Sequence, residues 1–220
     1  MNKNNKIRNL LLILAVIMPQ SIKVFIYSLV GWKIGNQVKI GFSYINCDET
    51  VLEDNIKIGH FNIIRRMKYF QLGKNSCIKN FNQFFFSGNK DVAPDWSAKL
   101  IIGENVSFMS HHFIDTGGSV EIGNNSILAG RDTHFWSHSF QPFGEKLKHV
   151  RTRIKIGEHV YIGARTTILG CSVPDGAIIG AGSIINKTFE PEENFRLLIA
   201  GNPAKIKKRY KIDRNSILVE

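Results

Sequence analysis

The sequence predicts an all-β protein in which short parallel strands wind into a coil around a ladder of aliphatic side chains. From residue 34 onward an aliphatic residue followed by glycine keeps recurring, and many of these pairs are separated by six residues or a multiple of six. Six residues are three β-strand periods, so the anchors can all point to one side of an extended path. An amphipathic helix would instead repeat at about 3.6 residues. Because one rung cannot bury its apolar side alone, the rungs must stack.

The anchors form blocks that each keep one phase, and a glycine after many of them permits a tight turn with positive φ. We expect the aliphatic and phenylalanine anchors inside the coil. His134 takes an aliphatic position, where a polar ring either closes a hydrogen bond in the core or does chemistry. The anchors are Ile34, Ile40, Leu52, Ile58 and Ile64; Leu72, Ile78, Phe84, Ile102, Phe108 and Ile114; Ile122, Leu128 and His134; Ile156, Ile162 and Ile168; and Val173, Ile179 and Ile185.

Composition narrows the class of protein. The chain has 220 residues, of which 43% are apolar and 21% charged, as in a folded domain of ordinary size. Three cysteines without a CxxC spacing argue against a disulfide scaffold or a zinc cluster and favour a reducing compartment. The net charge of +11 suits nucleic acid, an anionic membrane or a phosphorylated ligand. Because no C2H2, RNP-like or basic heptad motif is present, we expect no nucleic-acid binding.

The first 31 residues predict an apolar helical segment. Two apolar runs, Leu10–Met18 and Ile22–Val30, flank Pro19, which predicts two short helices joined by a turn. Neither run reaches the roughly 20 residues that span a bilayer. Two interpretations stay open: an apolar cap on the domain that follows, or a basic amphipathic anchor in which residues 7–30 contact the inner face of a membrane. We expect a cytoplasmic protein in either case.

Two stretches interrupt the repeat. Residues 86–101 contain no clear anchor and predict a degenerate coil or a loop. Residues 139–155 carry six basic side chains and predict a loop extruded from the coil. Extrusions of this length are usually functional, although a solvated surface loop is the alternative.

The hexads resemble those of the hexapeptide-repeat acyltransferases, in particular the sugar O-acetyltransferase branch. Three stretches carry the resemblance most specifically: Ile156-Gly-Glu-His-Val-Tyr-Ile-Gly-Ala-Arg, Ile179-Gly-Ala-Gly-Ser-Ile-Ile-Asn-Lys and Ala200-Gly-Asn-Pro-Ala-Lys. It covers about residues 32–209. The resemblance implies a left-handed parallel β-helix with three hexads per triangular coil, acetyl-CoA as donor, no required metal, and a homotrimer with active sites between subunits.

The predicted organisation has three parts. The N-terminal segment covers residues 1–31, and the β-helix domain covers residues 32–203, with the loop at residues 139–155. A basic tail covers residues 204–220. Because its first part, Ala204–Tyr210, has helix-compatible composition, we expect a helical tail that covers the open strand edge of the last coil.

The segment from Leu128 to Phe140 holds the expected catalytic group. Family members place a general-base histidine within an Ala-Gly…Phe-Trp-x-His pattern, which maps here onto Ala129, Gly130, Phe135, Trp136 and His138. A neutral imidazole near pH 7 can accept the proton of a sugar hydroxyl during direct attack on a thioester. The resemblance therefore implies His138 as the base. The expected acceptor-binding residues are Asp115, Asp132, His134 and Trp136. The two acids are also candidates to orient the imidazole of His138.

The resemblance also implies the residues that bind coenzyme A. Small side chains would form the floor of a groove for the pantetheine arm, and two lysines would meet the phosphates. Asn186 stands where that branch usually has threonine. The expected contacts are Ala164, Ala181, Gly182, Asn186, Lys187 and Lys208. Cys171 has no histidine beside it in sequence, so a small buried hydrophobe is the favoured interpretation over a nucleophile.

The favoured function is acetyl-CoA-dependent O-acetylation of a sugar hydroxyl of a bacterial surface polysaccharide or its precursor. N-acetylation of an amino sugar nucleotide would use the same fold and donor. A gamma-class carbonic anhydrase is a third alternative, since it needs three histidines on a metal and His111, His112, His134 and His138 are available. A scaffold without enzymatic activity is the fourth.

Overall fold

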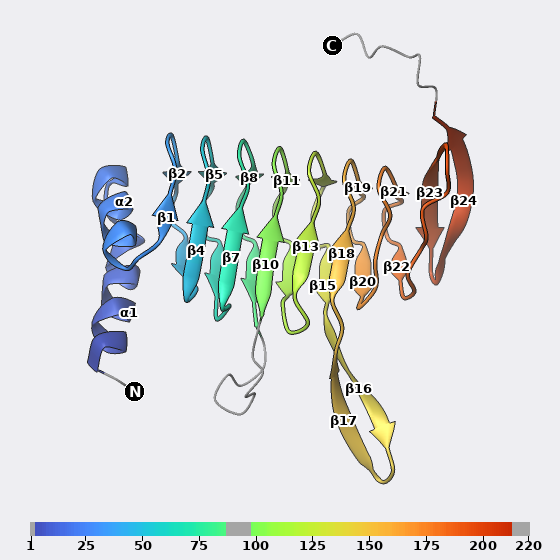
Figure 1. The fold of residues 1–220 in the computed structure, drawn as a ribbon, viewed down its shortest axis with the longest axis horizontal. Coiled ribbons are helices and arrows are strands. Elements are labelled where there is room, and N and C mark those ends of the chain that lie inside the picture. Colours follow the sequence, from blue (N-terminus) through green and yellow to red (C-terminus); the bar gives the residue numbers. More distant parts are fainter. Residues whose placement is uncertain (1–2, 87–97, 213–220) are drawn as a thin grey trace.

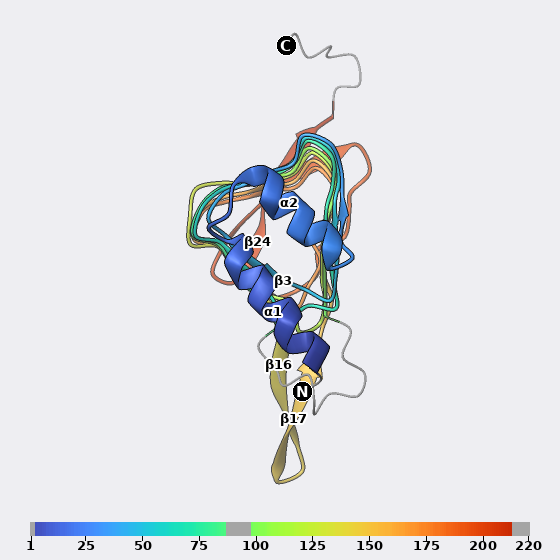
Figure 2. The same ribbon diagram turned by 90° about the vertical axis from the view of Figure 1, so that its left-hand side faces the viewer.

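The chain folds into a parallel β-helix with a triangular cross-section, capped by two helices at its N-terminal end (Figures 1 and 2). The structure is a computed structural model that describes residues 3–86 and 98–212. Most coils contribute one short strand to each of three sheets, and the strands of successive coils pair in parallel. The all-β prediction is confirmed. Most of the predicted interruption at residues 86–101 lies outside the described residues.

The three sheets are the three sides of the triangle. Sheet 1 consists of β1 (Lys33–Ile34), β4 (Glu49–Leu52), β7 (Tyr69–Leu72), β10 (Lys99–Ile102), β13 (Val120–Ile122) and β18 (Ile154–Ile156). Sheet 2 consists of β2 (Lys39–Ile40), β5 (Lys57–Ile58), β8 (Cys77–Ile78), β11 (Ser107–Phe108), β14 (Ile127–Leu128), β19 (Tyr161–Ile162), β21 (Ile178–Ile179), β23 (Phe195–Gly201) and β24 (Ala204–Lys211). Sheet 3 consists of β3 (Tyr44–Asn46), β6 (Ile63–Arg65), β9 (Gln83–Phe85), β12 (Phe113–Asp115), β15 (His134–Trp136), β20 (Thr167–Leu169) and β22 (Ile184–Ile185).

The predicted anchors form the core, with one error. The aliphatic and phenylalanine anchors are buried, apart from the partly buried Ile34 in the first coil. His134 is not an anchor, because Phe135 is fully buried in its place and pairs in register with Ile114. Seven residues lead from Leu128 to Phe135, one more than the usual six, and positive φ angles before β15 absorb the additional residue. A one-residue shift moves a strand side chain to the opposite face, so His134 lies on the outer face of sheet 3.

A column of buried polar side chains closes the corner between sheets 2 and 3 from the inside. The amide of Asn62 donates to Ser43 at 3.1 Å, and the amide of Asn82 donates to Asn62 at 3.0 Å. The backbone N–H of His112 donates to Asn82 at 2.9 Å, and its Nδ1 accepts from the backbone N–H of Thr133 at 3.3 Å. Burial lowers the pKa of His112 to about 4, so this imidazole is neutral near pH 7.

Two short helices cover the first coil. α1 (Lys3–Ala15) and α2 (Gln20–Leu29) lie side by side across the end of the triangle (Figure 2). Leu12 and Tyr27 are fully buried beneath them. The buried ammonium of Lys23 donates to the carbonyl oxygens of Ile40 and Gly41 at 3.0 and 2.7 Å, so it satisfies the open end of sheet 2. The helices are therefore the cap that one of the two interpretations predicted.

The same helices and the turn between them carry large apolar side chains that are exposed. No helix in the described part of the chain is long and apolar enough to cross a membrane. The apolar outer face is defined by eight side chains that are 40–68% exposed, namely Ile7, Leu10, Ile13, Leu14, Ile17, Ile22, Phe25 and Leu29.

The C-terminal tail is not helical as far as residue 212, and that prediction is wrong. β23 adds to sheet 2 in parallel beside β21, and β24 returns antiparallel to β23. Ala204 is buried and Ile206 partly buried on β24, while Lys205, Lys207 and Lys208 are exposed to solvent. Pairing with the open edge of β23 satisfies its backbone groups, and this outweighs the helical preference of the composition. Residues 213–220 lie outside the described part.

The predicted loop at residues 139–155 is mainly an antiparallel hairpin. β16 (His138–Phe143) pairs with β17 (Lys146–Arg151), and Gly144 adopts a φ of +61° at its tip. The hairpin projects from the edge where sheet 3 gives way to sheet 1 (Figure 1). Its first residue is His138, so the regular coil fixes the position of this imidazole.

Candidate active site

The imidazole of His138 is held by a buried carboxylate one coil earlier. Its Nδ1 lies 2.7 Å from Oδ2 of Asp115, the last residue of β12. Asp115 is fully buried, whereas 21% of the His138 side chain is exposed. The Ser137 hydroxyl donates to the same carboxylate oxygen at 2.9 Å, and the backbone N–H groups of Ser137 and Gly117 donate at 3.3 Å each. Three donors thus fix the carboxylate beside the ring.

This contact determines which nitrogen of His138 can act as a base. A buried carboxylate favours the proton on Nδ1, which leaves a lone pair on Nε2. Within residues 3–86 and 98–212, no protein group hydrogen-bonds to Nε2. The arrangement can therefore accept a proton from a bound hydroxyl, and Asp115 would stabilise the resulting imidazolium.

Aromatic groups surround the imidazole. The ring centroid of Trp136 lies 6.5 Å from that of His138, and the ring of Phe113 lies 4.8 Å from Trp136. His149 of β17 lies 5.2 Å from His138 on the hairpin side. Partial burial is the main cause that lowers the pKa of His149 below its usual value, and the positive charge of Arg151 acts in the same direction. From the sequence, His149 was expected only as one of the basic side chains of the loop.

The structure separates the two acids that were candidates to orient the base. Asp115 meets His138, but Asp132 precedes β15 at the opposite edge of sheet 3. The side chain of Asp132 is 43% exposed and pairs with Arg131 at 3.4 Å. His134 begins β15 and lies on the outer face beside Phe113, with ring centroids 5.9 Å apart. Trp136 and Asp115 are thus the expected acceptor residues nearest the base.

The expected coenzyme A residues fall into groups on different edges. Ala164, Ala181 and Gly182 lie in the turns after β19 and β21, at the corner between sheets 2 and 3. That corner is tightly packed, since a Cβ on Gly130 would come within 2.6 Å of the Cβ of Ala164. One chain therefore presents a ridge of small residues at the edge of sheet 3 that lies opposite His138.

The remaining three residues are polar and exposed. Asn186 and Lys187 directly follow β22, on the His138 side of sheet 3 and two strands beyond β15. The Lys187 ammonium lies 5.3 Å from the ring of Phe189. Lys208 is on β24, with its ammonium 4.7 Å from the ring of Tyr210. In a single chain, the width of sheet 3 therefore separates Lys187 from the small-residue ridge.

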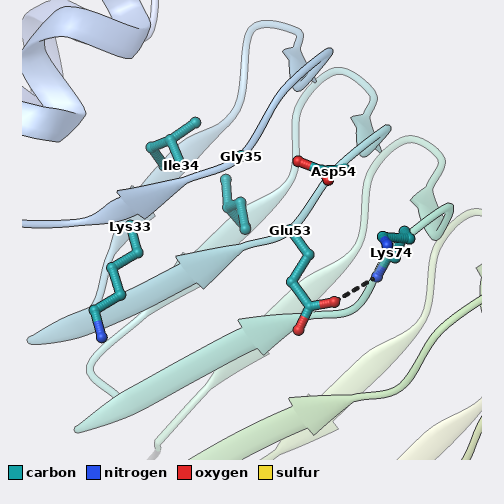
Figure 3. A pocket seen from close by; sticks show the side chains of 7 residues that line it. Lys33, Ile34, Gly35, Glu53, Asp54 and Lys74 are labelled. Atoms are coloured by element: carbon teal, nitrogen blue, oxygen red, sulfur yellow. Dashed lines mark hydrogen bonds between the residues drawn. The ribbon is translucent and has the colours of Figure 1, made fainter.

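Hollows also lie elsewhere on the coil. One of about 470 Å³ at the corner between sheets 1 and 2 is lined by Lys33, Gly35, Glu53, Asp54 and Lys74, among others (Figure 3). Its carboxylates hold turns together, because Glu53 accepts from the backbone N–H of Lys74 at 3.0 Å, and Asp54 accepts a backbone N–H at 2.7 Å. We assign this hollow to the packing of successive coils.

The other histidines and Cys171 do not form a second centre. His112 is inside the coil, whereas His111 is exposed at the corner and stacks on Phe81, with centroids 5.0 Å apart. In the described residues, no three His, Cys, Asp or Glu side chains are grouped so as to hold a metal ion. Cys171 is buried and donates to the carbonyl of Ile185 at 3.2 Å. Burial raises its thiol pKa to about 11, so it is a protonated packing residue.

Comparison with known proteins identifies the class. No family model matches the sequence. The chain is 31% identical over 186 residues to a chloramphenicol acetyltransferase of Klebsiella aerogenes, covering 78% of this chain and 76% of that protein. It is 26% identical over 147 residues to the galactoside O-acetyltransferase of Escherichia coli K12, covering 66% and 65%. Its fold is similar to the solved structure of the polySia specific acetyltransferase NeuO, with a TM-score of 0.66, 24% identity and coverage of 85% and 87%.

The chain therefore belongs to the hexapeptide-repeat acetyltransferases, and it is an acyltransferase with their left-handed parallel β-helix. The expected family and fold are confirmed. A second solved structure with this fold, a mutant of the N-acyltransferase AntD from Bacillus cereus, was determined in complex with dTDP and coenzyme A; its TM-score is 0.59 at 16% identity, with coverage of 88% and 90%.

Proposed function

We propose that the protein transfers the acetyl group of acetyl-CoA to a sugar hydroxyl of a bacterial surface polysaccharide or its precursor, with His138 as general base. The pair formed by His138 and the buried Asp115 carries this proposal, because it engages Nδ1 and leaves Nε2 without a protein hydrogen-bond partner among the described residues, at a partly exposed edge of the coil. Names of relatives support the sugar class, since galactoside O-acetyltransferase is among them.

The residues support direct transfer in two steps. Nε2 of His138 takes the hydroxyl proton while the sugar oxygen attacks the thioester carbonyl carbon, giving a tetrahedral oxyanion. The carbon–sulfur bond then breaks, and the departing thiolate of coenzyme A takes the proton back from the imidazolium. Asp115 stabilises the imidazolium between these steps. Backbone N–H groups of a neighbouring coil are the proposed donors to the oxyanion.

We further propose that a homotrimer completes the site. His138 and the ridge formed by Ala164, Ala181 and Gly182 lie at opposite edges of sheet 3 in one chain. A thioester can reach both only if the ridge of one subunit faces the hairpin edge of another. The ridge would take the pantetheine arm, and Lys187 and Lys208 would meet the phosphates.

The test is acetylation of a panel of sugars that offers both hydroxyl and amine acceptors, followed by mass spectrometry. We expect acetyl esters on hydroxyl sugars, and loss of turnover of at least about 10³-fold in His138→Ala with the fold retained. Acetyl amides on amino sugars alone would replace this proposal with N-acetylation. Near-normal turnover in His138→Ala would refute the assignment of the base.

The N-terminal end supports a membrane-proximal acceptor. The apolar outer face of α1 and α2 lies on the end of the coil, away from its core. The first 47 residues contain six basic and no acidic residues. Lys39 and Lys57 lie in register on adjacent strands, and both are exposed. An anionic surface would offset the repulsion between their positive charges. We propose that this end contacts an anionic membrane surface.

Sedimentation with lipid vesicles tests this contact. The protein should bind vesicles of mixed phosphatidylglycerol and phosphatidylcholine more strongly than phosphatidylcholine alone. Phe25→Ser should weaken binding, whereas Phe143→Ser at the hairpin tip, of similar exposure, should not. Equal binding by the Phe25 variant would refute the contact, and a concentration-dependent doubling of mass that Phe25→Ser abolishes would assign the face to a second copy instead.

A further inference from the structure

A continuous row of aromatic rings runs along the outer face of sheet 3 and ends at the candidate base. Trp136 on β15, Phe113 on β12 and Phe85 on β9 come from three neighbouring strands. The ring centroids of Phe85 and Phe113 are 5.0 Å apart, and those of Phe113 and Trp136 are 4.8 Å apart. All three side chains are only partly buried. We call these three residues, together with Arg65, the aromatic row.

Arg65 is the far end of the row. Its guanidinium carbon lies 5.8 Å from the ring centroid of Phe85, and its side chain is exposed on β6. In register, Arg65 is opposite Phe85, which is opposite Asp115. The row therefore extends over three strand spacings from Arg65 to Trp136, roughly 14 Å at about 4.8 Å per spacing.

The row lies on one side of His138 only. On the other side of β15, the strands of sheet 3 present Thr167, Leu169 and Ile184 on the outer face, none of them aromatic. Asn186 and Lys187, the proposed donor contacts, follow the last of these strands. Donor groups and aromatic rings are thus separated to opposite sides of the base along the axis of the coil.

We propose that the aromatic row binds an extended glycan chain, so that the enzyme acetylates oligomeric acceptors in preference to single sugars. This inference rests on the proposed sugar acetylation. A pyranose has an apolar C–H face and polar edges, and partly exposed aromatic rings are the surface that such a face fits. Three strand spacings accommodate roughly three sugar rings in an extended chain. Arg65 offers five N–H donors to hydroxyls at the far end.

Continuity with the base favours a glycan over other occupants of this face. The sugar that stacks on Trp136 would place a hydroxyl near His138, whose ring centroid is 6.5 Å from Trp136. The next sugars of the same chain would then lie over Phe113 and Phe85 without any change of direction. A chain bound in this way gains affinity with each ring it covers, up to the length of the row.

The test measures binding and transfer against acceptor length with the full-length protein. Malto-, chito- and sialic acid oligomers of one to six units are immobilised on surfaces, and binding of the protein to each is measured. Transfer from acetyl-CoA is measured on the same oligomer series. We expect at least one series to bind more strongly as it lengthens to about four units. Phe85→Ala should remove most of that gain, about fivefold, and leave transfer to a single sugar unchanged. Gln83→Ala, an exposed position on the same strand, is the matched control.

Three outcomes would overturn the proposal that the aromatic row binds a glycan. The first is that no oligomer series gains affinity with length, and the second is that Phe85→Ala keeps this gain. The third is that Phe85→Ala alters the sedimentation of the assembly, which would place the rings in a subunit interface. The proposed function fails separately. Acetyl transfer to single sugars without any gain in affinity with length would support the proposed function and refute glycan binding by the aromatic row. Length-dependent binding without acetyl transfer to any sugar would support glycan binding by the aromatic row and refute the proposed function.

Discussion

Replacement of Asp115 by asparagine tests the candidate site most directly. The hydroxyl of Ser137 and the backbone N–H of Gly117 both donate to the carboxylate oxygen that contacts His138. These donors should hold the amide oxygen of asparagine in the same place, so the hydrogen bond to Nδ1 survives. What Asp115→Asn removes is the negative charge beside the imidazolium that forms during the reaction.

The contact gives the magnitude of this loss. Unit charges about 4 Å apart interact by about 4 kcal/mol at the effective dielectric constant of a partly exposed protein site. His138 is 21% exposed, so solvent screening reduces that figure to roughly 2–4 kcal/mol. Each 1.36 kcal/mol is about tenfold in rate. We therefore expect kcat to fall roughly 30- to 10³-fold with little change in KM.

The assay is release of the coenzyme A thiol under saturating acceptor, with thermal unfolding as a check on the fold. Asp132→Asn is the matched control, because Asp132 lies at the opposite edge of sheet 3 and pairs with Arg131. It should change kcat less than threefold. The assignment of Asp115 fails if Asp115→Asn retains kcat within threefold of the native enzyme, or if both variants lose activity equally.

Three further predictions concern stability and the base of the hairpin. The pKa of His112 is about 4 in the fold against 6.5 in the unfolded chain, so the unfolded chain binds more protons between these pH values. The free energy of unfolding should therefore fall by up to about 3 kcal/mol as the pH drops from 6.5 to 4. Urea titrations of His112→Gln should show a flatter pH dependence than those of the native protein. Phe135→Ala should cost about 3–5 kcal/mol of unfolding free energy by urea titration, because this ring is fully buried; a loss below about 1 kcal/mol would contradict its place in the ladder. A Cβ at Gly118 would approach the carbonyl oxygen of Ser137 to 2.5 Å, so Gly118→Ala should lower kcat as well as the melting temperature. Gly144→Ala is the control: its added Cβ meets no atom within 4 Å, and kcat should be unchanged.

The ladder could be predicted from sequence because its signal is local. Each coil repeats the same demand for an aliphatic anchor, so Ile102, Leu128 and Ile162 can be placed without knowledge of distant residues. The error at His134 has a physical cause. Two ring side chains, His134 and Phe135, follow a turn with one additional residue, and the six-residue count selects the wrong one of the two.

Long-range pairing explains the other failures. β24 is held by the edge of β23, and a segment composition that suits a helix carries no information about that edge. Asp115 and His138 are 23 residues apart, and only the coil brings them together. A usable signal did exist: once Ile114 is matched to Phe135 instead of His134, Asp115 falls beside the residues that lead into His138.

The arrangement along the coil axis links the proposals to one another. From His138, the aromatic row extends over β12 and β9 to Arg65 on β6, toward the end of the coil that α1 and α2 cover. Asn186 and Lys187 lie in the opposite direction. If the apolar outer face of the helices rests on a membrane, a glycan in the aromatic row would extend from the base toward that membrane, while coenzyme A would enter from the far side. A lipid-linked glycan could then reach Nε2 of His138 without crossing the path of the donor.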